Sequence, residues 1–192
     1  MMMINKAVAP LINEEGLVNR AKDDLAAFEA VYDFYFAQVY NYVRYRVWDG
    51  QVADDLTSEI FETVLKKLHT YQPERGAFSA WLFAIARNTV NTHLRRQKIR
   101  RWFSLDQFHN HSDRKPTPDE LIIKNEIQQK LLWAVSQLSQ RERELIALKF
   151  TSGLTNRAIS EMTGLKENHV AVILHRAVQR IRTLMDTDEE KL

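Results

Sequence analysis

The chain of 192 residues contains no cysteine, which excludes disulfide bonds, thiolate metal sites and a cysteine nucleophile. Glycine and proline are scarce, with five and four residues. No apolar run approaches the ~20 residues that a membrane-spanning helix needs, and Met1 to Ala9 lacks the apolar run of a secretory signal. We therefore expect a cytoplasmic protein without membrane insertion, whose 45% hydrophobic residues suffice for the core of one domain or of two small ones.

Charge is segregated along the chain although the formal net charge is only +2. Between Arg75 and Leu105 there are seven Arg or Lys residues and no Asp or Glu, whereas acidic residues crowd the stretch from Asp54 to Glu62. A basic face attracts phosphate, and an acidic face attracts a basic surface. Two kinds of partner are therefore indicated.

The apolar residues recur at helical spacing in nearly every segment, which predicts an all-α protein without a sheet. Three helices of one bundle are predicted from stripes led by Phe28, by Leu56 and by Phe78, with Leu65 widening the second stripe. Periodicity stops at a polar, proline-bearing stretch that is typical of a linker. The predicted order is a leader (1–24), the bundle (25–101), the linker (102–118) and a second helical domain (119–192), which resumes with a capping pattern at Thr117.

The second domain carries the spacing of a helix-turn-helix. A capping box at Ser139 opens one helix, Thr155 can cap the next, and Gly164 permits a tight turn before a helix from Lys166 to Met185. An ordinary helical hairpin is the alternative. In a helix-turn-helix the second helix enters the major groove. The candidate DNA contacts there are Arg157, Lys166, Asn168, His169, Ala171, Val172, His175 and Arg176.

In the first domain, aromatic residues alternate with cations around the start of the third helix. Single strands are bound in this way, because bases stack on aromatic faces while a positive groove follows the phosphates. Core packing is the alternative for Phe78 and Trp81, because both also fall on the apolar register of the helix. The candidate contacts to melted DNA are Tyr71, Arg75, Phe78, Trp81, Arg87, Asn88, Arg95 and Arg96.

The acidic stretch places Asp55, Glu59 and Glu62 on one helix face, opposite the apolar stripe of the second helix. This pattern favours a docking helix for a basic partner. Routine stabilisation of the helix dipole is the alternative.

Three segments of the first domain together resemble the extracytoplasmic-function (ECF) sigma factors of bacterial RNA polymerase. They are the run from Ala27 to Phe36, the run from Ala53 to Phe61, and the run from Phe78 to Asn88 followed by Leu94-Arg95-Arg96. Leu138 to Leu145 and His175-Arg176-Ala177 continue the resemblance into the second domain. The match covers about Leu17 to Met185, nearly the whole chain.

The resemblance implies a division of labour. The first domain would bind the polymerase clamp through Asp54, Asp55, Ser58 and Glu59, and capture the melted −10 element, with a flipped base held by the loop around Tyr71 and Arg75. The second domain would read −35 duplex DNA and approach the polymerase flap, and an anti-sigma factor would be the regulator. No cofactor, metal or catalytic residue is implied.

Some positions depart from the family pattern. Ser58 replaces a typical glutamine, and Thr92 replaces a common aspartate. Ala171 and Ile173 stand where Lys and Arg are frequent, so Lys166, His169, His175 and Arg176 must carry more of the −35 contact.

Two other classes of protein compete with this interpretation. An enzyme is disfavoured because the sequence has no Gly-rich phosphate loop, no HExxH pattern and no nucleophile elbow, and His109, His111 and Asp113 form only a weak metal candidate. A free-standing helix-turn-helix regulator that binds duplex DNA without polymerase is the stronger alternative. Such a regulator has no need of an aromatic loop, a cationic helix and an acidic helix in one domain.

Overall fold

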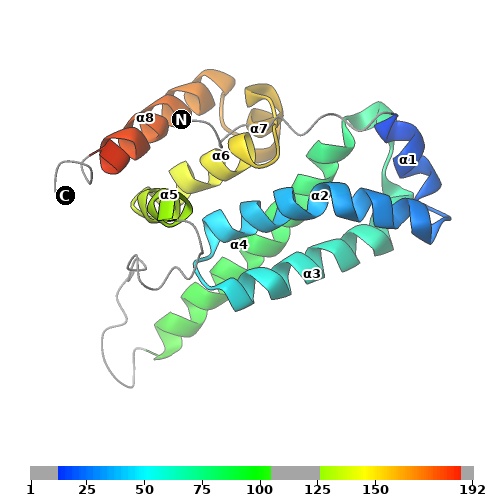
Figure 1. Ribbon diagram of the computed structural model, residues 1–192, viewed down its shortest axis with the longest axis horizontal. Helices are drawn as coiled ribbons and strands as arrows, with labels where there is room; N and C mark the ends of the chain where they lie inside the picture. The colour runs from blue at the N-terminus through cyan, green and yellow to red at the C-terminus, as the bar shows by residue number, and fades with distance from the viewer. Residues whose placement is uncertain (1–12, 105–125, 187–192) are drawn as a thin grey trace.

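The computed structural model describes residues 13–104 and 126–186, and over these ranges the chain is helical without strands (Figure 1). The first half comprises α1 (Glu14–Arg20), α2 (Leu25–Arg46), α3 (Gly50–Lys67), two short 3₁₀ turns (Leu68–Thr70 and Pro73–Arg75) and α4 (Phe78–Ser104). The second half comprises α5 (Glu126–Ser136), α6 (Gln140–Phe150), α7 (Asn156–Thr163) and α8 (Glu167–Asp186). The all-α prediction is confirmed.

Helices α2, α3 and α4 pack against one another as the predicted bundle. Asp24 and Asp49 cap α2 and α3, because their side chains accept hydrogen bonds from the amides of Ala26 and Val52. The apolar stripes face inward, and most of their residues are buried. Leu65 is an exception: it is 45% exposed, so the prediction that it widens the buried stripe of α3 is wrong. It lies at the edge of the stripe, where the helix surface turns toward solvent.

Helix α1 lies in the segment that the sequence indicated only as a weakly patterned leader. The Asn13 side chain accepts a hydrogen bond from the Gly16 amide at 3.1 Å and begins the helix, and Val18 is fully buried against the bundle. Asn13 adopts φ 61°, a left-handed conformation that asparagine tolerates better than most residues. Residues 1–12 lie outside the described part of the chain, as do 105–125, which hold most of the predicted linker and the capping pattern at Thr117.

The second half contains the predicted helix-turn-helix. Thr155 accepts a hydrogen bond from the Ala158 amide at 3.1 Å and caps α7, and Gly164 ends that helix at φ 74°, where glycine avoids the steric cost of a side chain. The Ser160 hydroxyl donates to the Leu165 carbonyl at 2.6 Å and ties the turn to α7. The predicted inward residues of α8, which are Val170, Leu174, Ala177 and Ile181, are all buried.

The capping box of α6 is formed as predicted. The Glu142 amide donates to the Ser139 hydroxyl, and the Ser139 amide donates to the Glu142 carboxylate at 2.7 Å. Burial alone would raise the pKa of Glu142, but its hydrogen bonds with Ser139 and the charge of Arg180 outweigh burial and lower the pKa below its ordinary value. The carboxylate therefore stabilises the fold at neutral pH, and this contribution is lost as pH falls through the lowered pKa.

Replacing Ser139 by alanine should reduce the free energy of unfolding by about 1 kcal/mol at neutral pH, because one cap hydrogen bond is lost. Thermal melts followed by circular dichroism at pH 7 and at a pH well below 4.5, the ordinary pKa of a glutamate, would measure this. The gap between wild type and Ser139→Ala should narrow as Glu142 becomes protonated. A gap that stayed constant over this range would show that the two halves of the box are not coupled.

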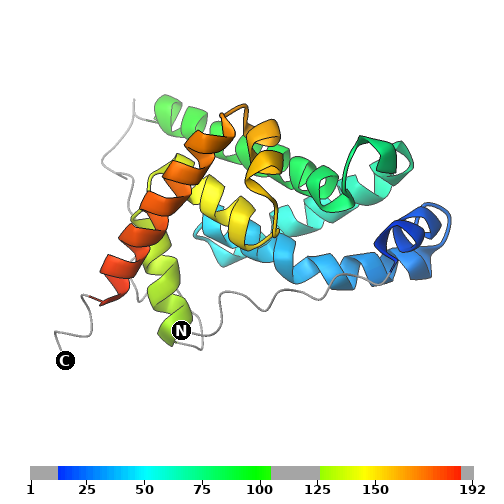
Figure 2. The same cartoon turned by 90° about the horizontal axis from the view of Figure 1, so that it is seen from above.

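The two halves pack together, with α6 lying against α2 and α5 touching the same helix (Figure 1). The buried apolar residues form one continuous core that runs from Val18 in α1 to Ile181 in α8. Seen from above, α8 and α5 lie on the far side of α6 from the tip that holds α1 (Figure 2). The sequence did not indicate whether the two halves would be joined or apart, and the structure shows them joined.

Candidate nucleic-acid and polymerase interfaces

Helix α4 presents the basic face that the sequence predicts. Asn88, Arg95 and Arg96 are exposed, and the whole helix carries no acidic side chain. Within the described residues, Arg95 and Arg96 form no ion pair, so their charge is available to a partner. The face combines cations with an amide that can donate and accept hydrogen bonds, a chemistry suited to a sugar-phosphate backbone.

The aromatic candidates gather at the start of α4, but they differ in exposure. Tyr71 and Phe78 lie 5.3 Å apart between ring centroids, and Trp81 lies 5.6 Å from each. Phe78 is only 1% exposed and Tyr71 only 6%, whereas Trp81 is partly exposed. In this conformation Phe78 and Tyr71 are core residues, and Trp81 is the ring of the three that retains surface for stacking.

The loop before α4 is held in shape by its own contacts. The Tyr71 hydroxyl donates to the Gly76 carbonyl at 3.0 Å, and Gly76 has φ 142°, a conformation that favours glycine. Arg75, on the intervening 3₁₀ turn, is exposed. The loop therefore has a fixed shape and leaves Arg75 exposed.

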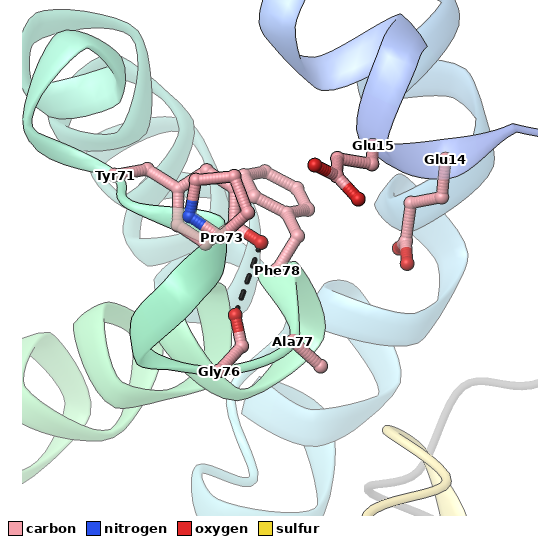
Figure 3. A pocket seen from close by; sticks show the side chains of 7 residues that line it. All are labelled: Glu14, Glu15, Tyr71, Pro73, Gly76, Ala77 and Phe78. Carbon is pink, nitrogen blue, oxygen red and sulfur yellow. Dashed lines mark hydrogen bonds between the residues drawn. The ribbon is translucent and has the colours of Figure 1, made fainter.

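A small pocket of about 160 Å³ opens beside this loop (Figure 3). Its lining consists of Glu14, Glu15, Tyr71, Pro73, Gly76, Ala77 and Phe78. Glu14 accepts a hydrogen bond from the Tyr35 hydroxyl, and burial together with this carboxylate raises the pKa of Tyr35 well above its ordinary value. Sequence reasoning missed the two glutamates, because it did not place a helix in the leader. The Asn13 cap followed by two acidic residues was the available signal.

The recognition helix α8 exposes every residue predicted on it. Lys166, just before its first turn, is exposed, as is a continuous set on the helix itself. That set is Asn168, His169, Ala171, Val172, His175 and Arg176. Ile173, at one of the positions that depart from the family pattern, is half-buried and packs against the core. On α7, Arg157 is exposed and pairs with Glu161 at 3.1 Å, a surface contact of small energy.

The acidic face of α3 is exposed over Asp54, Asp55, Ser58 and Glu59, opposite the buried Leu56 stripe. None of the acidic residues lies in the first turn, where the helix dipole acts. Routine dipole stabilisation therefore accounts poorly for this cluster.

An apolar patch lies close to the acidic face. Phe36 of α2 is 38% exposed and stacks on the buried Phe61 of α3 with ring centroids 6.4 Å apart. Leu65 of α3 is the second exposed apolar side chain of the patch. An exposed aromatic patch with polar groups at its rim is typical of a protein-docking site. The patch was missed at the level of sequence, because Phe36 and Leu65 fit the helical stripe.

Arg87 is the one α4 candidate that has an ionic partner within the described residues. Its Nε donates to Glu144 Oε1 of α6 at 2.7 Å, and the same carboxylate lies 3.6 Å from Arg46 Nη1 of α2. Arg46 also contacts the Tyr42 hydroxyl at 3.1 Å and donates to Asn91 Oδ1 at 2.8 Å. Burial raises the pKa of Tyr42 to about 12, although Arg46 opposes this shift.

Among the residues that the structure describes, no group of three or more His, Cys, Asp or Glu could hold a metal ion. The weak candidate formed by His109, His111 and Asp113 lies outside the described residues. Over the same described ranges, no helix is both long and apolar enough to cross a membrane.

The fold and its surfaces define a two-part helical DNA-binding protein, and comparison with known proteins gives the family. The Sigma-70 region 2 model matches residues 31–100, and the Sigma-70 region 4 model matches residues 128–181. These ranges fall on the α2–α4 bundle and on the half that contains the helix-turn-helix.

The chain is also similar to known ECF sigma factors over most of its length. The chain is 31% identical to the ECF RNA polymerase sigma factor BldN of Streptomyces coelicolor over 90% of its own length and 66% of that relative. It is 28% identical to SigX of Bacillus subtilis (86% and 87% of the two chains) and 30% identical to ShbA of Streptomyces griseus (69% and 71%). The solved sigma factor RpoE of Bartonella quintana, bound to the anti-sigma factor NepR, shares the fold with a TM-score of 0.67 at 20% identity, over 84% of this chain and 98% of that one. The chain belongs to the ECF sigma factors of RNA polymerase.

Proposed function

We propose that the chain binds core RNA polymerase and directs it to promoters by contacting melted −10 DNA with the first domain and −35 duplex DNA with the second. The observation that carries the proposal is the bundle itself, in which a carboxylate-free basic helix, α4, stands beside an acidic, partly apolar helix, α3. A regulator that only binds duplex DNA needs neither surface. The match to both sigma regions supports the proposal, and no comparison supports the free-standing regulator.

For the −10 element, we assign phosphate contacts to Arg95 and Arg96, base stacking to Trp81, and hydrogen bonding to Arg75 and Asn88. Exposure of all five side chains, partial for Trp81, supports this assignment. Three more candidates act in other ways: Tyr71 and Phe78 form the rigid base of the loop, and Arg87 contacts DNA once it leaves Glu144. A flipped base held over the loop would meet the rim of the pocket beside Tyr71.

For the −35 element, we assign contacts to the exposed face of α8 and to Arg157 of α7. Lys166, His175 and Arg176 contact phosphates, and Asn168 and His169 lie in the first turns, which reach base edges when such a helix enters the major groove. Ala171 and Val172 offer apolar contact to a thymine methyl group.

For the polymerase, we assign docking to Asp54, Asp55, Ser58 and Glu59, together with the neighbouring apolar patch of Phe36 and Leu65. We infer a cytoplasmic protein without enzymatic activity or a cofactor, divided into the leader, bundle, linker and second domain given above. The linker and second domain approach the polymerase flap. An anti-sigma factor is the proposed regulator, supported by the description of the solved RpoE neighbour as a complex with one.

Adding the protein to core RNA polymerase in a transcription assay on genomic fragments should yield discrete, promoter-specific transcripts. Mapping their 5′ ends would give both promoter elements, because each start must have one element near −10 and another near −35. Core polymerase alone is the control. Tight binding to a palindromic duplex without any effect on initiation would overturn the proposal in favour of the regulator.

A further inference from the structure

We propose that Glu144 closes a latch that holds the second domain against the bundle in the free protein, and that the closed latch competes with promoter DNA for Arg87. The consequence for promoter DNA rests on the proposed function, whereas the closed state of the free protein is independent of it. The latch consists of Glu144 on α6, Arg46 on α2 and Arg87 on α4. It joins three helices and both halves of the chain.

The geometry of the latch is that of a buried charge with one ionic partner. The whole Arg46 residue is 3% exposed, and its Nη atoms contact Tyr42, Asn91 and Glu144. Glu144, whose side chain is 16% exposed, is the one carboxylate that the structure places within ion-pair distance of Arg46 among the described residues. The Nε of Arg46 is buried without a hydrogen-bond partner. The guanidinium is therefore under-compensated even when the latch is closed.

This arrangement makes Glu144 a determinant of closure. A buried arginine that loses its carboxylate partner is strongly destabilised, because its charge stays out of water. When the two halves separate, water can reach that charge again. Removing Glu144 should therefore penalise the closed state more than the open one, and the equilibrium should move toward opening.

Two further contacts hold the same interface. The Arg143 guanidinium of α6 lies over the Trp48 ring, 5.0 Å from its centroid, just beyond the end of α2. The continuous apolar core adds a non-directional attraction between the halves. The apolar contact stabilises the association of the two halves, and the ionic contacts determine their relative orientation.

The consequence for promoter binding follows from the double use of Arg87. In the closed state its Nε donates to Glu144 at 2.7 Å, so the same nitrogen cannot donate to a phosphate. Closure therefore pairs the charge of Arg87 and occupies one of its donors, so Glu144 and a phosphate compete for this side chain. A partner that binds only the open form, such as core polymerase, would release Arg87 by shifting the population.

The natural absence of cysteine makes the latch directly measurable. Cysteines introduced at Glu29 on α2 and Gln179 on α8, both exposed, would carry a pair of spin labels, one on each half of the full-length chain. Pulsed electron paramagnetic resonance would then report the distribution of distances. Wild type should give one narrow distribution, and adding core polymerase should replace it with a longer one.

In the labelled chain, Glu144→Gln should raise the open fraction roughly tenfold, equivalent to about 1.4 kcal/mol. Glu126→Gln is the matched control, because it removes an exposed carboxylate whose ion-pair partner among the described residues is Lys130 of its own helix. Arg143→Gln should shift the distribution in the same direction by a smaller amount. If circular dichroism shows that Glu144→Gln is unfolded, the Arg143→Gln variant provides the test of the latch.

A broad distance distribution in the free wild-type protein would overturn the latch. So would a folded Glu144→Gln variant whose distance distribution matches that of wild type. This readout needs no DNA. If the latch behaves as expected but no promoter-specific transcript appears with core polymerase, the proposed function fails and the closed state stands. If transcripts appear and the distances do not change, the latch alone fails.

Discussion

Open-complex formation should fall at least about tenfold when Arg95 and Arg96 are both replaced by alanine. The two guanidinium groups lie on the exposed, carboxylate-free face of α4, where they contribute charge without supporting the core. Each phosphate contact that is lost removes one counterion-release step, so the slope of log K against log salt should fall by roughly 1.4 for two contacts to single-stranded DNA. Permanganate footprinting of the melted region, repeated at several salt concentrations with holoenzyme, would measure both effects.

The matched control is the pair Lys66 and Lys67, which are also adjacent, exposed cations on a bundle helix, α3. Replacing both by alanine changes the net charge equally and should leave the salt slope unchanged. The amount of holoenzyme formed should be the same for both double variants. If the two variants lowered DNA affinity equally, the effect would be one of net charge and not of a specific α4 surface.

Much of the second domain could be predicted from the sequence, because its structure is set by local interactions. The caps at Ser139 and Thr155 and the turn at Gly164 each depend on residues within a few positions of one another, and all three appear in the structure. The inward stripe of α8 follows from helical periodicity in the same way.

The contacts between the two halves could not be predicted, because they join residues far apart in the chain. Arg87 and Glu144 are 57 positions apart, and each also fits a solvated helix face in sequence. Whether Arg87 is free or paired depends on how α6 lies on α2, which no local pattern specifies. The sequence assigned Arg87 to DNA, and the structure adds the competing partner.

Aromatic residues were ambiguous for a different reason. Phe78 and Trp81 share the apolar register of α4, so core packing and base stacking predict the same spacing. Only exposure separates them, and exposure depends on how the loop from Leu68 to Gly76 folds over the helix start. Gly76 and the Tyr71 hydroxyl bond determine that path, and they leave Phe78 covered and Trp81 partly open.

Reversing the charge of both Asp55 and Glu59 to lysine should weaken binding to core polymerase by about a hundredfold. The two carboxylates are exposed one helical turn apart on α3, and a docking surface that meets them must be basic. Like charges placed together across an interface cost several kcal/mol. The dissociation constant of a fluorescently labelled chain for core polymerase would give the magnitude.

A control of the same design is available on the neighbouring helix. Glu29 and Asp33 of α2 are also exposed and four positions apart, so their reversal to lysine changes the net charge by the same amount. Only reversal of the α3 pair should reduce core binding severely. The two reversals should change the affinity of the free protein for −35 duplex DNA by the same amount. Because Asp55 lies beyond the first turn of α3, its reversal should not unfold the helix, and thermal melts would verify this. Equal losses of core binding for the two pairs would mean that long-range repulsion, and not contact at α3, governs docking.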